Sequence, residues 1–343
     1  MSDQLGTLDD LPQDYRDEMA KAGVAPLWPM MRNVLPHGAP NPATRSGYWN
    51  YDALRPLLLK AGELTPVEKA ERRVLVLSDP GRGVGAMQAT SSIYLGMQLL
   101  LPGESAPAHR HTPSAVRIVV EGSGGYTVVD GERLPMEEGD LVLTPGGEWH
   151  DHGHDGTDPV IWLDALDLPL FVYFEGSYAI EGPLQMQNNR PDASEVEYTA
   201  AGLVPSRQSG ITPRRYPMMR YPWAQTEKAL RQMAAYGGTA EVDFVNPETG
   251  EDVLPTLGFT AMMLQAGQQD APPLRSASCA FHVVSGSGQT QIDGKTISWG
   301  PKDTFTAPVF SKLTHKATQD SFLIRIHDRP LQTKLGYYEE RPR

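Results

Sequence analysis

The chain has 343 residues and a formal net charge of −12, with 40% hydrophobic and 21% charged residues. This composition is typical of a globular protein of about two domains, and the acidic charge excludes nucleic acid as a general partner because phosphate backbones would be repelled. The single cysteine, Cys279, excludes an internal disulfide. The N-terminus lacks the apolar segment of a signal peptide and the chain lacks an apolar run of about 18 residues, so we expect a cytoplasmic protein with no membrane partner.

The predicted elements change character along the chain. We expect residues 1–85 to form a helical arm followed by the first strands, with turn signals at Ala61-Gly62 and Thr65-Pro66 inside "WNYDALRPLLLKAGELTPVEKAERR". From "RVLVLSDPG" onward, short apolar runs end at glycine, proline or aspartate, which predicts an all-β sandwich or barrel. We place a first β-domain at 86–180, a linker with one helix, "WAQTEKALRQMAAYG", at 181–237, and a second β-domain at 238–343.

The second β-domain repeats the first. Gly103 and Gly122 are 19 positions apart, and so are Gly267 and Gly286, at an offset of 164. "VVEGSGGYTVVDGERL" matches "VVSGSGQTQIDGKTI", and "EEGDLVLTP" matches "GPKDTFTAP" at an offset of 163. Self-similarity of this length predicts two copies of one β-domain, although it says nothing of function.

Histidines in the first copy follow the period of a strand. In "PGESAPAHRHTPSAVRIVV", His109 and His111 share one strand face, and Arg117 joins them if the strand continues past Pro113. The later motif "GDLVLTPGGEWHDHGHDG" adds three histidines, again with period two: His150, His152 and His154. A lone histidine is usually an ordinary surface or core residue, but five in such clusters favour a metal site, since neutral imidazole is the commonest protein metal ligand. Three ligands from two strands would leave the open positions that a catalytic metal needs.

The spacing matches the two motifs of the cupin family. These are Gly103-x5-His109-x-His111 and Gly139-x5-Pro145-x-Gly147-x2-His150. Many cupins have a glutamate shortly after the second histidine, where this chain has Ala115 and Val116. A three-histidine site on a duplicated cupin resembles the gentisate 1,2-dioxygenase family, which includes salicylate and 1-hydroxy-2-naphthoate dioxygenases. The phrases "ERRVLVL", "WHDHG", "PVIWLDALDLPL" and "DRPLQTKLG" are similar to that family too.

This resemblance implies a bicupin, that is, two double-stranded β-helix (jelly-roll) barrels after a helical N-terminal arm. It implies Fe(II) held by His109, His111 and His150, and a homotetramer. The implied substrates are a small aromatic 2-hydroxy acid and O2, with the ring opened between the carboxyl-bearing and hydroxyl-bearing carbons. Gentisate is the expected substrate. Salicylate, 5-substituted salicylates and 1-hydroxy-2-naphthoate stay open as alternatives, as do a different metal-cupin enzyme and a non-enzymatic bicupin.

The second copy lacks the predicted ligands. The offsets map His109 to Pro273, His111 to Arg275 and His150 to Leu313. We therefore expect the C-terminal cupin to be metal-free and structural. The two histidines His282 and His315 are interpreted as ordinary.

Further site residues are expected from charge, strand face and family position. Arg117 is a cation suited to a substrate carboxylate or a developing anion, and Arg73 is a second candidate cation. Tyr94, Gly96 and Gln98 share one strand face, so the two polar side chains are expected to face the pocket, while Gly96 leaves space for the ring.

Two more residues are expected to act in the reaction. His152 could move a proton or hydrogen-bond the substrate hydroxyl. Asp164 could orient His152 or a ligand. His154 stands where the resemblance predicts asparagine, which leaves the exact substrate open.

Overall fold

The computed structural model describes residues 6–206, 214–237 and 240–343, so residues 207–213 of the predicted linker and 238–239 of the predicted second domain lie outside the described residues. The chain divides into two units, Met1–Ala43 and Thr44–Arg343. The first contains the helices α1 (Gln13–Lys21) and α2 (Met31–Val34), and none of its described residues is buried. No described helix is both long and apolar enough to cross a membrane.

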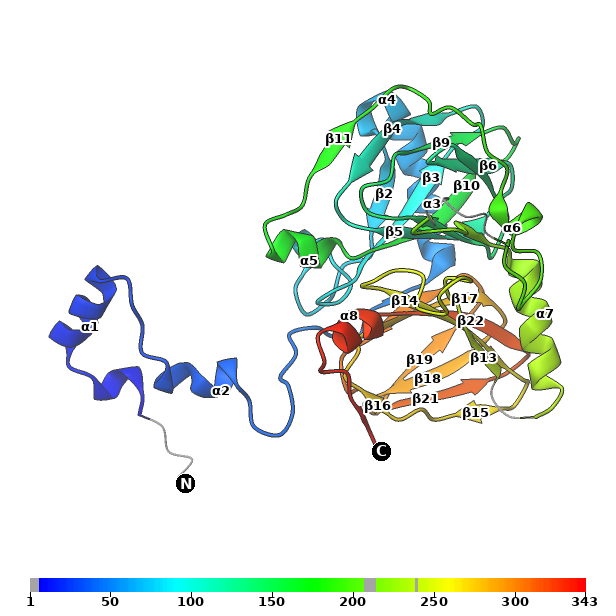
Figure 1. Cartoon of the computed structure of the whole chain (residues 1–343). Coiled ribbons are helices and arrows are strands. Elements are labelled where there is room, and N and C mark those ends of the chain that lie inside the picture. Colours follow the sequence, from blue (N-terminus) through cyan, green and yellow to red (C-terminus); the bar gives the residue numbers. More distant parts are fainter. Residues whose placement is uncertain (1–5, 207–213, 238–239) are drawn as a thin grey trace. The chain divides into compact units, whose positions relative to one another are not determined.

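The second unit contains two β-barrels, which confirms the predicted duplication (Figure 1). In the first barrel, the sheet β12-β8-β5-β10-β3-β2 faces the sheet β11-β4-β9-β6-β7. The strands of this barrel are β2 (Arg73–Val76), β3 (Tyr94–Leu100), β4 (Ser105–His111), β5 (Ala115–Glu121), β6 (Gly125–Val129), β7 (Glu132–Met136), β8 (Leu141–Thr144), β9 (His150–His154), β10 (Val160–Leu166), β11 (Ala179–Glu181) and β12 (Arg220–Tyr221).

The second barrel repeats this arrangement with the sheet β1-β20-β17-β22-β14-β13 and the sheet β15-β21-β18-β19, while β16 and β23 form a separate pair. The strands of this barrel are β1 (Tyr48–Trp49), β13 (Ala240–Asp243), β14 (Gly258–Leu264), β15 (Gln269–Asp270), β16 (Leu274–Arg275), β17 (Cys279–Ser285), β18 (Gly288–Ile292), β19 (Lys295–Trp299), β20 (Thr304–Ala307), β21 (Leu313–Ala317), β22 (Ser321–His327) and β23 (Glu340–Arg341). The remaining helices are α3 (Tyr51–Leu64), α4 (Val67–Ala70), α5 (Leu168–Tyr173), α6 (Ala193–Val196), α7 (Trp223–Ala234) and α8 (Arg329–Lys334).

The core lies along the six-stranded sheets. The strands β3, β5 and β10 are buried over almost their whole length, because one face lines the barrel interior and the other is covered. Their Val, Ile and Leu content suits a strand that is buried on both faces. In contrast, β4 alternates between exposed and buried residues, as a strand with one solvent-exposed face does.

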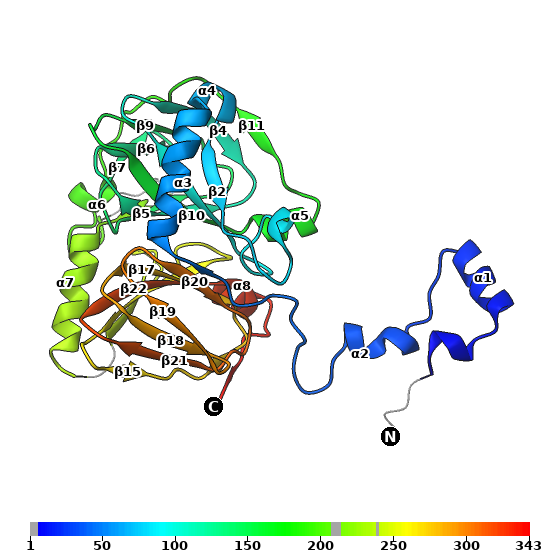
Figure 2. The ribbon, with the colours of Figure 1, turned by 180° about the vertical axis from the view of Figure 1, so that it is seen from behind.

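Each barrel caps the N-terminus of a helix that packs on the other barrel (Figures 1 and 2). Helix α3 packs on β2 and β3, yet its first amide, on Tyr51, donates to Asp303 of the second barrel at 2.8 Å. Helix α7 packs on β13 and β14, yet its first amide, on Trp223, donates to Asp140 of the first barrel at 2.8 Å. A carboxylate at a helix N-terminus satisfies an otherwise unpaired N–H group. The exchange ties the two barrels together.

A second pair of carboxylates crosses between the barrels. Asp167, after β10, accepts a hydrogen bond from Thr256 Oγ1 at 2.5 Å, and Asp328, after β22, accepts one from Ser92 Oγ at 2.5 Å. Thr256 and Ser92 are 164 positions apart, the offset of the sequence repeat. The duplication therefore extends to the contacts between the copies.

The structure corrects one predicted turn. Helix α3 ends before Pro66 as expected, but it continues through Gly62 instead of breaking there. A Cβ at Gly62 would lie 3.1 Å from Leu99 Cδ2 of β3, so the glycine allows the helix to approach the sheet closely.

Candidate metal centre

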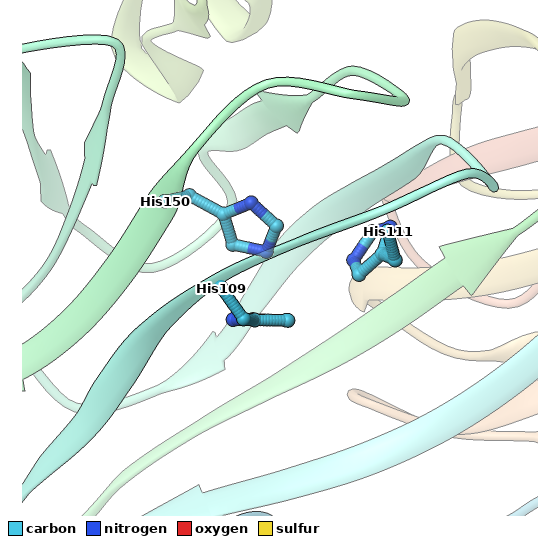
Figure 3. A group of neighbouring side chains, drawn as sticks. All are labelled: His109, His111 and His150. Atoms are coloured by element: carbon cyan, nitrogen blue, oxygen red, sulfur yellow. The ribbon is translucent and has the colours of Figure 1, made fainter. Parts of the chain in front are cut away.

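The three predicted ligands converge inside the first barrel. His109 and His111 end β4, and His150 begins the neighbouring strand β9, where it lies opposite His109. Their ring centroids are 4.2 Å apart for His109 and His150, 4.8 Å for His111 and His150, and 5.2 Å for His109 and His111 (Figure 3). One nitrogen of each ring lies within 4.8 Å of the others, and this is the only such cluster of three among the described residues.

The ring nitrogens suit a metal ion. Nδ1 of His111 donates to the carbonyl oxygen of Pro113 at 2.7 Å, and Nδ1 of His150 donates to that of Glu148 at 3.0 Å, so each ring keeps its lone pair on Nε2. Nε2 of His150 is buried and has no hydrogen-bond partner among the described residues. An unpaired buried acceptor is costly unless a ligand satisfies it.

The histidines are also held neutral. Burial lowers the pKa of His109 to about 2 and that of His111 to about 4, and it lowers the pKa of His150 well below its usual value. The charges of Arg72 and Arg117 act in the same direction. A neutral imidazole is the form that ligates a metal, so the cluster is ready to bind one at neutral pH.

A buried polar chain lies beside the cluster. Arg117 is 3% exposed; its Nε forms an ion pair with Asp164 Oδ1 at 3.3 Å, and Nη1 donates to Thr144 Oγ1 at 2.6 Å. Its Nη2 donates to Nε2 of His152 at 3.0 Å, and Nδ1 of His152 donates to Thr127 Oγ1 at 2.9 Å. Arg117 thus lies between Asp164 and His152, whereas the sequence predicted a direct contact between those two as one option.

The second cation at the cluster is Arg72 rather than Arg73. Arg72 Nη2 lies 2.5 Å from Nδ1 of His109, and Arg72 Nε is buried without a hydrogen-bond partner among the described residues. Arg73 lies opposite Leu99 on the other face of the sheet, where its guanidinium pairs with Glu104. Neighbouring residues along an extended chain point to opposite faces, so only one of two adjacent arginines reaches the interior.

Three predicted pocket residues share the interior face with this network. Strand β10 places Asp164 opposite Gly96 and Trp162 opposite Gln98. Directly paired residues lie on the same face of a sheet. Burial, with Asp164 nearby, raises the pKa of Tyr94, so its phenol stays protonated. A Cβ on Gly96 would lie 2.7 Å from the Tyr94 hydroxyl oxygen, which shows that the glycine makes room for this ring.

Three other histidines, His154, His282 and His315, have structural partners. His154 donates from Nε2 to the Asp158 carbonyl at 2.5 Å and accepts from the Gly156 amide at Nδ1, so it holds the turn after β9. In the second barrel, Nδ1 of His282 lies 3.1 Å from Thr304 Oγ1, and Nδ1 of His315 lies 2.8 Å from Thr290 Oγ1. No cluster of three metal-binding side chains is found among the described residues of that barrel.

Comparison with known proteins agrees with this geometry. Residues 96–166 match the family model described as a cupin domain. A gentisate 1,2-dioxygenase of a Ralstonia species is 52% identical, with 99% of this chain and 97% of that protein covered. The chain belongs to the gentisate 1,2-dioxygenase family.

Other members of the gentisate 1,2-dioxygenase family are similar over most of their length. A 1-hydroxy-2-naphthoate 1,2-dioxygenase of Nocardioides sp. (strain KP7) is 34% identical, covering 89% of this chain and 81% of that protein. The crystal structure of salicylate 1,2-dioxygenase from Pseudoaminobacter salicylatoxidans with gentisate has a TM-score of 0.91 at 30% identity, covering 99% of this chain and 96% of that one.

Sequence reasoning missed two residues of this gentisate 1,2-dioxygenase family site. Arg72 precedes β2 by one residue, and its face could be predicted only from the pairing of Val74 with Gln98. Trp162 is fully buried, and its ring lies 5.6 Å from that of His152. Its position opposite Gln98 was not visible without the strand register.

Proposed function

We propose that this chain is an Fe(II)-dependent ring-cleaving dioxygenase that inserts both atoms of O2 into gentisate, between the carboxyl-bearing and the ortho hydroxyl-bearing carbons. The observation that carries the proposal is the three-histidine cluster with two guanidinium groups beside it, in a chain 52% identical to a gentisate 1,2-dioxygenase. Full-length similarity at this level supports the same reaction class.

The ligand set fits a divalent metal ion, and membership of the gentisate 1,2-dioxygenase family is the support for iron. His109, His111 and His150 would hold the ion, and three neutral ligands leave its dipositive charge uncompensated, so an anionic substrate is favoured. When bound, the ion supplies Lewis acidity and a path for electrons from the aromatic ring to O2. Arg72 and Arg117 add positive charge next to the cluster, and Asp164 offsets part of it.

Arg72 is the better candidate for binding the substrate carboxylate. Its Nε has no hydrogen-bond partner among the described residues, and its side chain is 23% exposed. The Arg117 guanidinium already contacts Thr144, Asp164 and His152, and it is almost fully buried. We therefore assign carboxylate binding first to Arg72, and to Arg117 the positioning of His152; direct binding of the substrate by Arg117 stays a prediction.

His152 is proposed to hydrogen-bond a substrate hydroxyl or to move its proton. Burial and the charge of Arg117 lower its pKa well below the usual value, so the ring is neutral. Arg117 can only donate, hence Nε2 of His152 is the acceptor nitrogen and Nδ1 carries the hydrogen bonded to Thr127. The acceptor nitrogen of His152 therefore faces Arg117, and the hydrogen bond to Thr127 fixes the tautomer of the ring.

Other ring substrates remain candidates. The relatives include enzymes for 5-aminosalicylate, for 1-hydroxy-2-naphthoate and for salicylate. His154, the residue that departs from the family pattern, bonds to the backbone of Gly156 and Asp158 rather than to a pocket residue. This favours an indirect effect of His154 on the substrate, through the shape of the turn.

Oxygen uptake by anaerobically Fe(II)-loaded protein tests the proposal. Gentisate, salicylate, 5-substituted salicylates and 1-hydroxy-2-naphthoate are compared in parallel, with Zn(II)-loaded protein as the control. We expect one O2 consumed per gentisate and the highest kcat/KM for gentisate. No uptake with any of them, with iron shown to be bound, would contradict a dioxygenase. Activity with zinc alone would indicate a different metal enzyme.

A homo-oligomer is also proposed. The segment 6–43 carries apolar side chains that it does not bury itself, among them Leu27, Trp28, Val34 and Leu35. An exposed apolar surface of this kind marks an interaction site, and a second copy of the chain is the expected partner. Light scattering on the full chain and on a form lacking residues 1–43 tests this, since the truncated form is expected to have fewer subunits.

A further inference from the structure

The second barrel contains a polar cavity that the oxygenase reaction does not use. Its volume is about 300 Å³, and its walls come from β13, β16, β17, β22, α8 and β23. The lining includes Glu241, Arg275, Cys279, Arg325 and His327. A cavity of this size can hold a small organic molecule.

The cavity is the counterpart of the metal pocket. The sequence repeat maps His111 of the first barrel onto Arg275. Strand register maps Asp164 of β10 onto Arg325 of β22, because the two residues occupy the same positions relative to β5 and β17. A guanidinium group thus stands at the position of a metal ligand.

Both arginines have donors left over. Arg325 is buried; its Nη2 donates to Thr260 Oγ1 at 3.2 Å and lies 3.6 Å from Glu241 Oε2. Arg275 donates from Nε to Glu340 Oε1 at 3.1 Å. Among the described residues, the Nη groups of Arg275 and the Nε and Nη1 groups of Arg325 have no hydrogen-bond partner. Two guanidinium groups with free donors are suited to one carboxylate.

Two hydrogen-bond acceptors, on His327 and Glu241, lie in the same cavity. Thr260 donates its hydroxyl hydrogen to Asp243 Oδ1 at 2.6 Å, so in its 3.2 Å contact with Nε2 of His327 the ring is the donor. Nδ1 of His327 is therefore an acceptor, and it is buried without a partner among the described residues. Glu241 supplies a carboxylate in the same lining. Acceptors of this kind call for a ligand that carries hydroxyl groups.

We propose that the second barrel holds a ligand site for a small hydroxylated carboxylic acid, whose carboxylate is bound by Arg275 and Arg325. The hydroxyl groups of the ligand donate to His327 and Glu241. A dicarboxylic acid without hydroxyl groups is disfavoured because its second anion would lie against Glu241. The site is independent of the iron chemistry of the first barrel, so its test does not depend on that activity.

Isothermal titration calorimetry under nitrogen tests the proposal by stoichiometry. Gentisate, 4-hydroxybenzoate and glycolate are titrated into the His111→Ala chain, where the metal site of the first barrel is disabled, and succinate serves as the dicarboxylate comparison. We expect at least one hydroxy acid to bind at one site per chain, and Arg275→Gln in that background to weaken this binding about tenfold or more. Arg341→Gln is the matched control, because Arg341 lies on the same strand pair but stacks on Phe310, outside the cavity lining.

A second measurement needs no substitution. Cys279 is the only thiol of the chain and lines the cavity, so bound ligand is expected to slow its alkylation by N-ethylmaleimide several-fold in the unmodified protein. The proposal is overturned if none of the three hydroxy acids binds at millimolar concentration. It is also overturned if binding survives Arg275→Gln unchanged while the variant is folded by circular dichroism, or if saturating ligand leaves the alkylation rate unaltered.

Discussion

Replacing Arg72 by glutamine tests whether the interior cation of the pocket binds the substrate. A hydrogen bond to a charged group contributes about 1.5–3 kcal/mol. The Arg72 side chain is 23% exposed, so water screens part of the interaction and the lower half of that range applies. A loss of about 1.5–2 kcal/mol corresponds to a KM for gentisate raised by about 10- to 30-fold. The thermal midpoint is expected to change little.

The neighbouring Arg73→Gln variant is the matched control. Arg73 is buried on the opposite face and pairs with Glu104, which is only 19% exposed. Removing one partner of such a pair leaves an uncompensated charge, so we expect stability to fall by about 2–3 kcal/mol, less than for a fully buried pair, with KM nearly unchanged. Steady-state oxygen uptake and thermal unfolding of both variants separate the two effects. A raised KM in Arg73→Gln with a normal KM in Arg72→Gln would refute the assignment of faces.

Three further substitutions test the first barrel. His111→Ala is expected to reduce bound iron from about one per chain to a trace and to abolish oxygen uptake, and iron retained at the normal level would remove His111 from the ligand set. Gly96→Ala brings a methyl group within 2.5 Å of Val74 Cγ1 and 2.7 Å of the Tyr94 hydroxyl, so we expect about 1–3 kcal/mol of destabilisation and a raised KM. Unchanged kinetics would show that the Tyr94 ring does not face the substrate. Burial raises the pKa of Asp167 to about 6, so the protonated carboxyl stabilises the fold below about pH 4, and this stability is lost as the pH rises through 6. In urea unfolding between pH 4 and pH 7, the unfolding free energy of the wild type should therefore fall by up to about 3 kcal/mol relative to that of Asp167→Asn. A difference that stays constant with pH would contradict the raised pKa.

The metal ligands could be predicted from local sequence because their spacing is itself the geometry. Period two in a strand puts His109 and His111 on one face, and the second motif provides His150 within a short β segment. The duplication was equally visible, since both copies keep the same glycine positions. These features depend on neighbours in the chain, which is the range over which a sequence pattern determines structure.

The surroundings of the ligands depend on strand register and on contacts between distant segments. Nothing local shows that Arg72 rather than Arg73 reaches the interior, because a shift of one residue in the pairing of β2 with β3 exchanges the two faces. The chain from Asp164 through Arg117 to His152 likewise joins three strands.

The second barrel shows the same division between sequence and tertiary structure. The sequence alone showed that the predicted ligands are not repeated in this barrel, because Pro273, Arg275 and Leu313 stand at the corresponding positions. Only the tertiary structure brought Arg275 to the cavity that Arg325 and His327 line, since β16, which carries Arg275, lies far along the chain from β22, which carries the other two. Residue type is local information, whereas the grouping of charges that gives a pocket its chemistry is decided by packing between strands.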